Sequence, residues 1–215
     1  MKKILLAGFD PFGEEEVNPA TEAVKCMNEE VIENYVVSTI EVSTIFDKCI
    51  EQLTDAINRI NPDLVICVGQ AGGRPDISIE RVAINVNDAR IPDNNGNQPI
   101  DTPVIPLGPS AYWSTLPIKA IVKSLKEDGI PASVSQTAGT FVCNHIFYGL
   151  MHELASNHSS VRGGFIHIPF LPEQTAEKPE QPSMSLDIIV KGLRGAISTA
   201  ILNKEDVKAA GGQIS

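Results

Sequence analysis

Short apolar runs alternate with segments of helical periodicity along most of the chain, and this alternation limits the possible folds more than any other feature. Residues 3–8 and 63–69 are almost continuously apolar, which is typical of strands buried on both faces of a parallel sheet. Strands separated by helices predict an α/β fold with one open, mostly parallel sheet and helices on both faces. The strands are expected at residues 3–8, 35–42, 63–69, 77–86, 131–134 and 163–169, and the helices at residues 20–31, 45–60, 116–126, 146–155 and 184–202.

The size and continuity of the chain indicate one domain. Its 215 residues contain no internal repeat and no linker, so we expect a single domain spanning residues 1–215. Residues 89–109 are rich in proline and form a long irregular stretch, and such stretches tend to be functional or to make subunit contacts. By composition, its part at residues 99–109 and the Pro- and Glu-rich loop at residues 172–182 are candidate interfaces.

Charge and cysteine usage exclude several classes of partner. The net charge of −10 would repel a phosphate backbone, so nucleic acid is not expected as a partner. No run approaches the roughly 20 apolar residues that a membrane span needs, and the first apolar run breaks at Asp10 before it is long enough for a secretory signal. The four cysteines are far apart and form no CxxC pair, which favours reduced thiols in the cytoplasm and indicates no metal site.

Cys143 is the first candidate for chemistry. It follows the turn-forming stretch at residues 135–142 and precedes the helical segment that begins near Ile146. A thiol at a helix N-terminus lies where backbone N–H groups and the helix dipole favour negative charge, so we expect a lowered pKa and a reactive thiolate. An inert cysteine that packs as a small buried hydrophobe is equally compatible with the position.

His167 is the candidate base for that thiol. His145 is only two residues from Cys143 and so points to another face of the helix, His152 also faces away, and His158 lies in a polar loop. His167 ends a buried strand at the edge where Cys143 should emerge, which leaves it as the base by elimination. A histidine whose hydrogen bonds are satisfied within the core is the alternative.

Glu80 is a carboxylate among apolar residues, and a buried carboxylate needs a partner. That partner is either His167, which Glu80 would then orient, or one of Arg81 and Arg90 in a structural ion pair.

The glycine-rich turns do not indicate a nucleotide. Residues 69–73 lack the GK[ST] ending of a P-loop, and residues 8–13 do not match GxGxxG, while Asp10 would oppose a pyrophosphate. These glycines are also compatible with a purely conformational role. Four segments with unusual chemistry leave strands where sites form in such sheets: residues 9–13, 69–74, 137–143 and 167–169.

With Glu80, Cys143 and His167 in this order, the chain resembles the pyrrolidone-carboxylate peptidase (pyroglutamyl peptidase I) family. Two long stretches carry the resemblance: GQAGGRPDISIERVAIN at residues 69–85 and SQTAGTFVCN at residues 135–144. The segments GFDPFG at 8–13, ARIPD at 89–93 and GGFIHIP at 163–169 also match, and the similarity runs from residue 3 to about residue 203.

The resemblance implies a cysteine exopeptidase that needs no cofactor and removes N-terminal pyroglutamate (5-oxoproline) from peptides. Cys143 would be the nucleophile, His167 the general base and then acid, and Glu80 the residue that orients the imidazole. The family fold is a three-layer α/β/α sandwich, often assembled as a homotetramer, so pyroglutamyl peptides and further copies of the chain are the implied partners.

The substrate that the resemblance implies also assigns binding residues. The pyroglutamyl lactam is neutral and suits apolar walls, so Phe9 and Phe12 are expected to clamp the ring. Backbone groups near Gln70, Phe141 and Val142 would pair with the lactam. Arg90, with the Cys143 N–H, would stabilise the tetrahedral oxyanion.

Two functions of other classes compete with this one. A thiol-based redox sensor would use Cys143 without Glu80, and a non-enzymatic binder of small ligands would use the Phe9 and Phe12 pocket alone. The sequence assigns no role to Cys26, Cys49 or Cys67.

Overall fold

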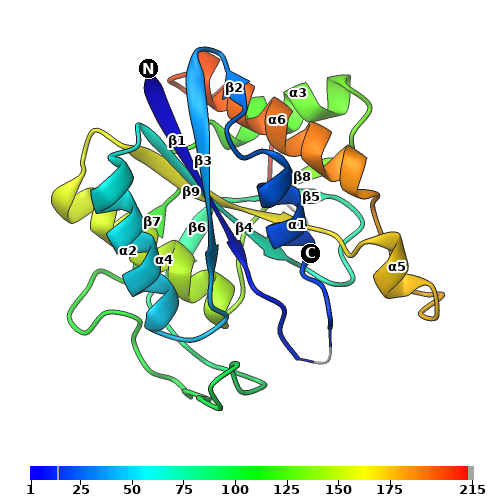
Figure 1. Cartoon of the computed structure of the whole chain (residues 1–215). Helices are drawn as coiled ribbons and strands as arrows, with labels where there is room; N and C mark the ends of the chain where they lie inside the picture. Colours follow the sequence, from blue (N-terminus) through cyan, green and yellow to red (C-terminus); the bar gives the residue numbers. More distant parts are fainter. Residues whose placement is uncertain (14, 213–215) are drawn as a thin grey trace.

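A seven-stranded sheet forms the centre of the computed structural model, which describes residues 1–13 and 15–212 (Figure 1). Its strand order is β2-β3-β1-β4-β9-β5-β8. All neighbours pair in parallel except β2 with β3 and β5 with β9. The strands are β1 (Lys2–Phe9), β2 (Val31–Ile32), β3 (Tyr35–Val42), β4 (Leu64–Gln70), β5 (Ile77–Glu80), β8 (Ala132–Ser135) and β9 (Arg162–Ile168).

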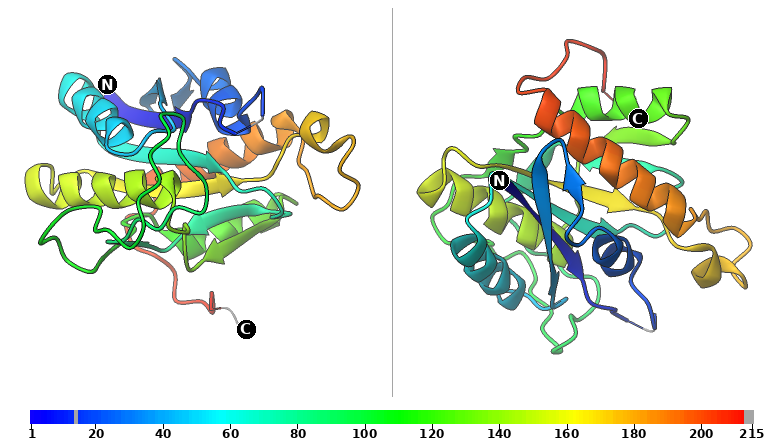
Figure 2. Two further views of the ribbon diagram at one scale, coloured as in Figure 1. Left: turned by 90° about the horizontal axis from the view of Figure 1, so that it is seen from below. Right: turned by 45° about the horizontal axis from the view of Figure 1, so that its top comes forward.

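Helices cover both faces of this sheet, as the alternating sequence pattern predicted. The helices are α1 (Pro19–Cys26), α2 (Lys48–Ile60), α3 (Ile118–Glu127), α4 (Val142–Asn157), the short α5 (Pro172–Thr175) and α6 (Leu186–Leu202). Helices α1, α3 and α6 pack on one face and α2 and α4 on the other, as Figures 1 and 2 show. The mostly parallel sheet between two helical layers confirms the predicted fold class.

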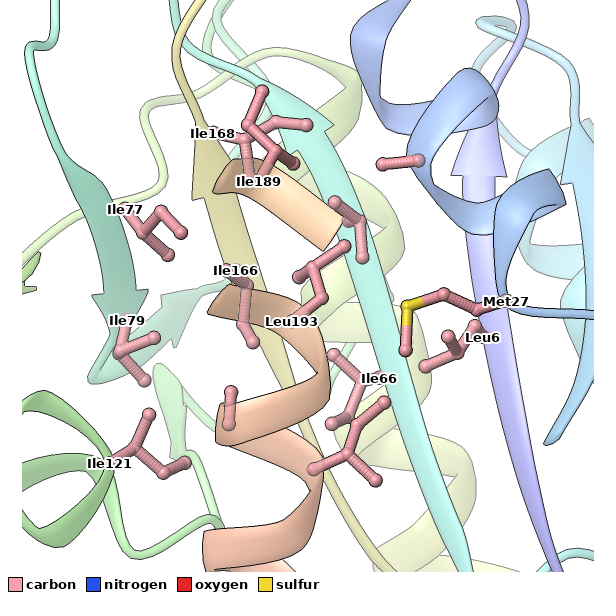
Figure 3. Packing of buried hydrophobic residues seen from close by; sticks show 14 of the residues in the cluster. Leu6, Met27, Ile66, Ile77, Ile79, Ile121, Ile166, Ile168, Ile189 and Leu193 are labelled. Atoms are coloured by element: carbon pink, nitrogen blue, oxygen red, sulfur yellow. The ribbon is translucent and has the colours of Figure 1, made fainter. Parts of the chain in front are cut away.

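The two faces of the sheet form two apolar clusters. Along β1 the side chains alternate, so that Leu6 belongs to one cluster and Leu5 to the other. Figure 3 shows the first cluster, in which Ile66 and Ile166 from the sheet lie beside Leu193 from α6. Burial of the strands on both faces explains why they read as continuous apolar runs.

The second cluster holds the helix that carries the candidate nucleophile. Helix α4 packs on α2 and on the sheet through side chains that are almost fully buried, among them Ile146, Phe147 and Leu150. This packing fixes the axis of α4, and therefore the position of its first turn relative to the strand ends.

Several expected boundaries were wrong. The helix expected at residues 20–31 ends at Cys26, because residues 29 and 34 take left-handed conformations that turn the chain through β2 into β3. The helix expected from Ile146 begins at Val142. The strand expected at residues 77–86 is divided into β5 and β6 (Val82–Ile84). Strand β6 pairs with β7 (Ala111–Trp113) in a second, two-stranded sheet, and β7 was not predicted.

Residues 85–110 form the long connection between β6 and β7. It is held by an isolated bridge between Asn87 and Thr102 and extends beyond the sheet on the side of α2 and α4, drawn in green in Figure 1. This agrees with the irregular stretch expected at residues 89–109. Within the part of the chain that the structure describes, every helix is too short or too polar to cross a membrane.

Candidate active site

The ends of β4 and β9 lie side by side at the edge of the sheet where α4 begins. Gly69 of β4 is the register partner of His167 of β9, and Ser78 of β5 pairs with His167 from the other side. Glu80 lies two residues beyond Ser78 on the same face of β5. The antiparallel pairing of β5 with β9, which the sequence did not predict, therefore directs Glu80 toward His167.

Cys143 is the second residue of α4 and is half-buried. Its Sγ atom lies directly over Gly69, since a Cβ carbon built at Gly69 would be 3.0 Å from the sulfur. Phe141 occupies the N-cap position of α4 with no side-chain hydrogen bond to the helix. The first backbone N–H groups of α4, including that of Cys143, are thus left free of a side-chain cap beside the sulfur.

The expectation of a lowered thiol pKa at this helix N-terminus was wrong. The pKa of the Cys143 thiol is raised to about 12, mainly by burial and also by the negative charge of Glu80, against the opposing charge of Arg74. Burial disfavours the charged thiolate relative to the neutral thiol. Cys143 is therefore a neutral thiol at rest and needs a base to become a nucleophile.

His167 is the candidate for that base, since it is the register partner of Gly69, over which the sulfur lies. Its Nδ1 atom lies 2.7 Å from Glu80 Oε1, and both side chains are buried. Burial lowers the pKa of His167, Arg74 lowers it further, and Glu80 only partly opposes the shift, so the imidazole is neutral. Because Nδ1 carries the proton that it donates to the carboxylate, Nε2 has the free lone pair that accepts a proton.

Glu80 is ionised and has two partners. Burial alone would raise the pKa of its carboxyl, but the interaction with His167, with smaller contributions from Ser135 and Arg74, outweighs burial and lowers that pKa. Arg74 Nη1 donates to Glu80 Oε1 at 2.8 Å. The sequence left three candidate partners for Glu80, and the structure shows His167 in contact with it. The other two candidates do not contact Glu80, since Arg81 donates to the carbonyl of Gly211 and Arg90 is exposed.

A small pocket opens beside Cys143. It is lined by every residue that the sequence assigned to substrate binding, together with Asn18 and Thr44, which it did not assign; the full set is Phe9, Phe12, Asn18, Thr44, Gln70, Phe141, Val142 and Cys143. The rings of Phe12 and Phe141 lie 6.3 Å apart, and Phe46 packs edge-on against Phe141 from behind.

Asn18 shows why part of the lining was missed. An asparagine directly before a proline is typical of a helix N-cap, and the side-chain oxygen of Asn18 accepts from the N–H of Ala20 at 3.0 Å. The amide nitrogen of the same side chain donates to the carbonyl of Asp10, which fixes the loop between β1 and α1 over the pocket. The capping role of Asn18 is visible in the sequence, whereas its bond to the Asp10 carbonyl depends on the tertiary structure.

Arg90 and His145 stand apart from this group. Arg90 is exposed, and among the described residues its side chain takes part in no hydrogen bond or ion pair, so its oxyanion role stays a prediction. His145 is fully buried and points away from Cys143, as expected. Its Nε2 accepts from the N–H of Asp47 and its Nδ1 donates to Asn87, both at 2.9 Å.

Metal chemistry finds no support in the side chains. Across residues 1–13 and 15–212, no group of three or more His, Cys, Asp or Glu side chains is arranged to hold a metal ion. The candidate site therefore consists of a thiol, an imidazole and a carboxylate beside a pocket with aromatic walls. That combination suits acyl transfer through a covalent intermediate.

Comparisons with known proteins point to the same chemistry. Residues 2–203 match the family model described as pyroglutamyl peptidase. A pyrrolidone-carboxylate peptidase of Brevibacillus brevis is 63% identical over the full length of both chains. A second one, from Bacillus cereus, is 60% identical over 99% of each chain.

Solved structures agree with these sequence matches. The crystal structure of pyroglutamyl peptidase I from Bacillus amyloliquefaciens superposes with a TM-score of 0.94 at 55% identity, covering 96% of this chain and all of the other. A mutant pyrrolidone carboxyl peptidase from the hyperthermophile Pyrococcus furiosus gives a TM-score of 0.90 at 42% identity, covering 93% of this chain and 98% of the other.

Proposed function

The chain belongs to the pyroglutamyl peptidase family of cysteine peptidases, which remove N-terminal pyroglutamate, and we propose that it does so through an acyl-enzyme on Cys143. The observation that carries the proposal is the hydrogen-bonded pair of His167 and Glu80 beside the pocket that Cys143 lines. This pair provides a neutral imidazole with a free Nε2, the group that a thiol of high pKa requires.

In the first half-reaction, Cys143 Sγ attacks the carbonyl carbon of the pyroglutamyl residue while its proton passes to His167 Nε2. The ionised Glu80 stabilises the imidazolium that forms, through the Nδ1 hydrogen bond. The tetrahedral oxyanion collapses, the C–N bond breaks, and His167 returns the proton to the leaving amine. A pyroglutamyl thioester remains on Cys143.

The second half-reaction restores the enzyme. Water attacks the thioester carbon and gives its proton to His167 Nε2, and collapse of the new tetrahedral intermediate breaks the C–S bond. The departing thiolate takes the proton back from His167, so that the products are 5-oxoproline and the original thiol. No step in this scheme uses a metal or a cofactor.

The oxyanion is stabilised by the N-terminus of α4. The Cys143 N–H belongs to the first turn, where no side chain caps the helix, and it lies next to the attacking sulfur. We retain Arg90 as the second candidate for this role on the strength of the family resemblance alone. Its exposed position requires the guanidinium to swing inward when substrate binds.

The pocket accounts for the choice of a pyroglutamyl group over an ordinary amino terminus. None of its lining residues is a carboxylate, so a buried ammonium would lose its hydration without gaining an ion pair. A neutral lactam avoids that cost and can lie between Phe9, Phe12 and Phe141, with Gln70 as a polar neighbour.

The expected location and assembly are further parts of the proposal. All four cysteines are free thiols, which supports the cytoplasm as the compartment. Ile100 and Leu107 in the connection between β6 and β7 are exposed, which supports a subunit interface there and the homotetramer implied by the family. Light scattering should then give a mass of four 23.1 kDa chains. We treat residues 1–215 as one catalytic domain, because the site draws on strands across a single sheet.

The experiment compares two arylamides that differ only in the lactam carbonyl. The enzyme should release the arylamine from the L-pyroglutamyl conjugate with a kcat/KM at least about 100-fold higher than from the L-prolyl conjugate, whose ring nitrogen is a charged amine. Equal rates on the two conjugates, or no release from the first, would reject the proposed function.

A further inference from the structure

Arg74 lies on the turn between β4 and β5 and contacts two parts of the active site at once. Its Nη1 donates to Glu80 Oε1 at 2.8 Å, and its Nη2 donates to the carbonyl of Thr137 at 3.2 Å. Its side chain is 31% exposed, whereas that of Glu80 is fully buried. Glu80 Oε1 thus receives both the guanidinium and the imidazole of His167, while Oε2 has no partner within the described residues.

Thr137 belongs to the segment that delivers Cys143. Residues 136–141 connect β8 to α4. The N–H of Thr137 donates to Ser135 Oγ at the end of β8, and the N–H of Gly139 donates to Thr137 Oγ1. Thr140 anchors the same segment to the carbonyl of Asp88. Through Arg74, the carbonyl of Thr137 in this segment is linked to the carboxylate of Glu80 and so to the pair that Glu80 forms with His167.

We propose that Arg74 is a positioning residue that sets the orientation of Glu80, and through it of His167, relative to the segment carrying Cys143. A planar guanidinium reaches both acceptors at fixed angles, which a lysine ammonium on a flexible stem does not reproduce. The inference rests on the proposed function, because it assigns Arg74 a place in the same reaction.

The charges around His167 allow the positioning role of Arg74 to be tested by a measurement other than stability, namely the ionisation of His167. The ionisable groups that act on the imidazole are Glu80 from β5, through its hydrogen bond, and Arg74 from the turn before β5, through its charge. The thiol of Cys143 from α4 lies over Gly69, the register partner of His167. Arg74 lowers the pKa of both His167 and Cys143, so its removal raises both. A residue that only supported folding would leave these ionisations unchanged.

The test compares Arg74→Met and Arg74→Lys with the wild type, with Arg59→Met as a control that removes an exposed arginine from the last turn of α2. We expect kcat/KM on the pyroglutamyl arylamide to fall about 10-fold or more in Arg74→Met, with incomplete recovery in Arg74→Lys. The acid limb of the pH profile of Arg74→Met should move to higher pH, and NMR titration should show a raised pKa of the His167 imidazole. Arg59→Met should match the wild type in all three.

The possible outcomes separate the positioning role of Arg74 from the proposed peptidase function. An Arg74→Met enzyme with the wild-type pH profile and the wild-type His167 titration overturns the positioning role, whatever its stability. A wild type that is inactive on the arylamide rejects the proposed function, while the titration of His167 still tests the contact between Arg74 and the pair.

Chemical rescue provides a second measurement. Arg74 lines a wide groove together with Lys123, Ser135 and Thr137. A small cation can therefore enter from solvent and occupy the position of the missing guanidinium. Guanidinium at non-denaturing concentration should restore part of the activity of Arg74→Ala, whereas urea, which has a similar shape but no charge, should not. Equal effects of the two solutes on Arg74→Ala overturn the inference.

Discussion

Gly69 provides the space that the sulfur of Cys143 occupies. The two residues come from β4 and α4, and a Cβ carbon at position 69 would lie 3.0 Å from Sγ and 2.7 Å from the ring of Phe165. A methyl group there must displace the nucleophile or the ring that supports it.

We therefore expect Gly69→Ala to impair catalysis more than folding. Overpacking of this kind costs about 1–3 kcal/mol of stability, and a displacement of the sulfur by about 1 Å can lower the rate by about 100-fold. Steady-state kinetics on the pyroglutamyl arylamide and thermal unfolding of the same sample measure the two effects. The variant Gly212→Ala is a useful control, because nothing lies within 4 Å of a Cβ carbon there and Gly212 is not among the glycines with a positive φ. Wild-type kcat/KM in Gly69→Ala would show that Sγ is not held against this strand.

His145 has a structural role that its sequence neighbourhood conceals. It connects α4 to the start of α2 and to the connection between β6 and β7, through the N–H of Asp47 and the side chain of Asn87. Replacement by alanine leaves the buried side chain of Asn87 and the backbone N–H of Asp47 without these hydrogen bonds, which costs about 1–3 kcal/mol. Chemical denaturation of His145→Ala should show this loss, and the folded fraction should keep most of its activity. Wild-type stability in this variant would contradict the assignment.

The same histidine makes stability depend on pH. Burial lowers the pKa of His145 to about 4, while Asp47 partly opposes the shift, so the unfolded chain binds this proton more readily than the folded one. The contribution of His145 is therefore complete above about pH 6.5 and is lost as the pH falls from 6.5 toward 4, by up to about 3 kcal/mol. The free energy of unfolding of His145→Gln, measured across this window, should fall less steeply than that of the wild type. Parallel curves for the two proteins would exclude His145 as the source.

The pH dependence of catalysis should follow His167. Its pKa is lowered by burial and by Arg74 against the opposing effect of Glu80, and the reaction needs the neutral imidazole. The acid limb of kcat/KM should thus lie below pH 6.5, the ordinary value for histidine. Since the pKa of the Cys143 thiol is about 12, activity should not depend on a separate thiolate ionisation near neutral pH. An acid limb above pH 6.5 would contradict this account of the resting state.

The main elements were predictable because burial leaves a clear signal in the sequence. Continuous apolar runs identify β4 and β9, and the alternating segment before Glu80 identifies β5. The direction of β5 was not predictable, since a short strand carries no mark of the neighbour with which it pairs.

The chemical groups were also predictable, but their environment was not. Cys143, His167 and Glu80 stand out by residue type and position, and the structure brings Glu80 and His167 into contact. Arg74 does not stand out, because its link to Glu80 depends on the conformation of the turn between β4 and β5. The pKa of Cys143 was expected in the wrong direction because sequence shows the helix terminus but not the depth of burial.

The central claim is that Cys143 carries the pyroglutamyl group during turnover. Acid quenching of the enzyme during reaction with an activated pyroglutamyl ester, followed by peptide mass spectrometry, tests this most directly. We predict one pyroglutamyl adduct on the peptide that contains Cys143, sensitive to hydroxylamine as a thioester is, and neither adduct nor turnover in Cys143→Ala. Turnover in Cys143→Ala at the wild-type rate, or an adduct on another residue, would contradict the account.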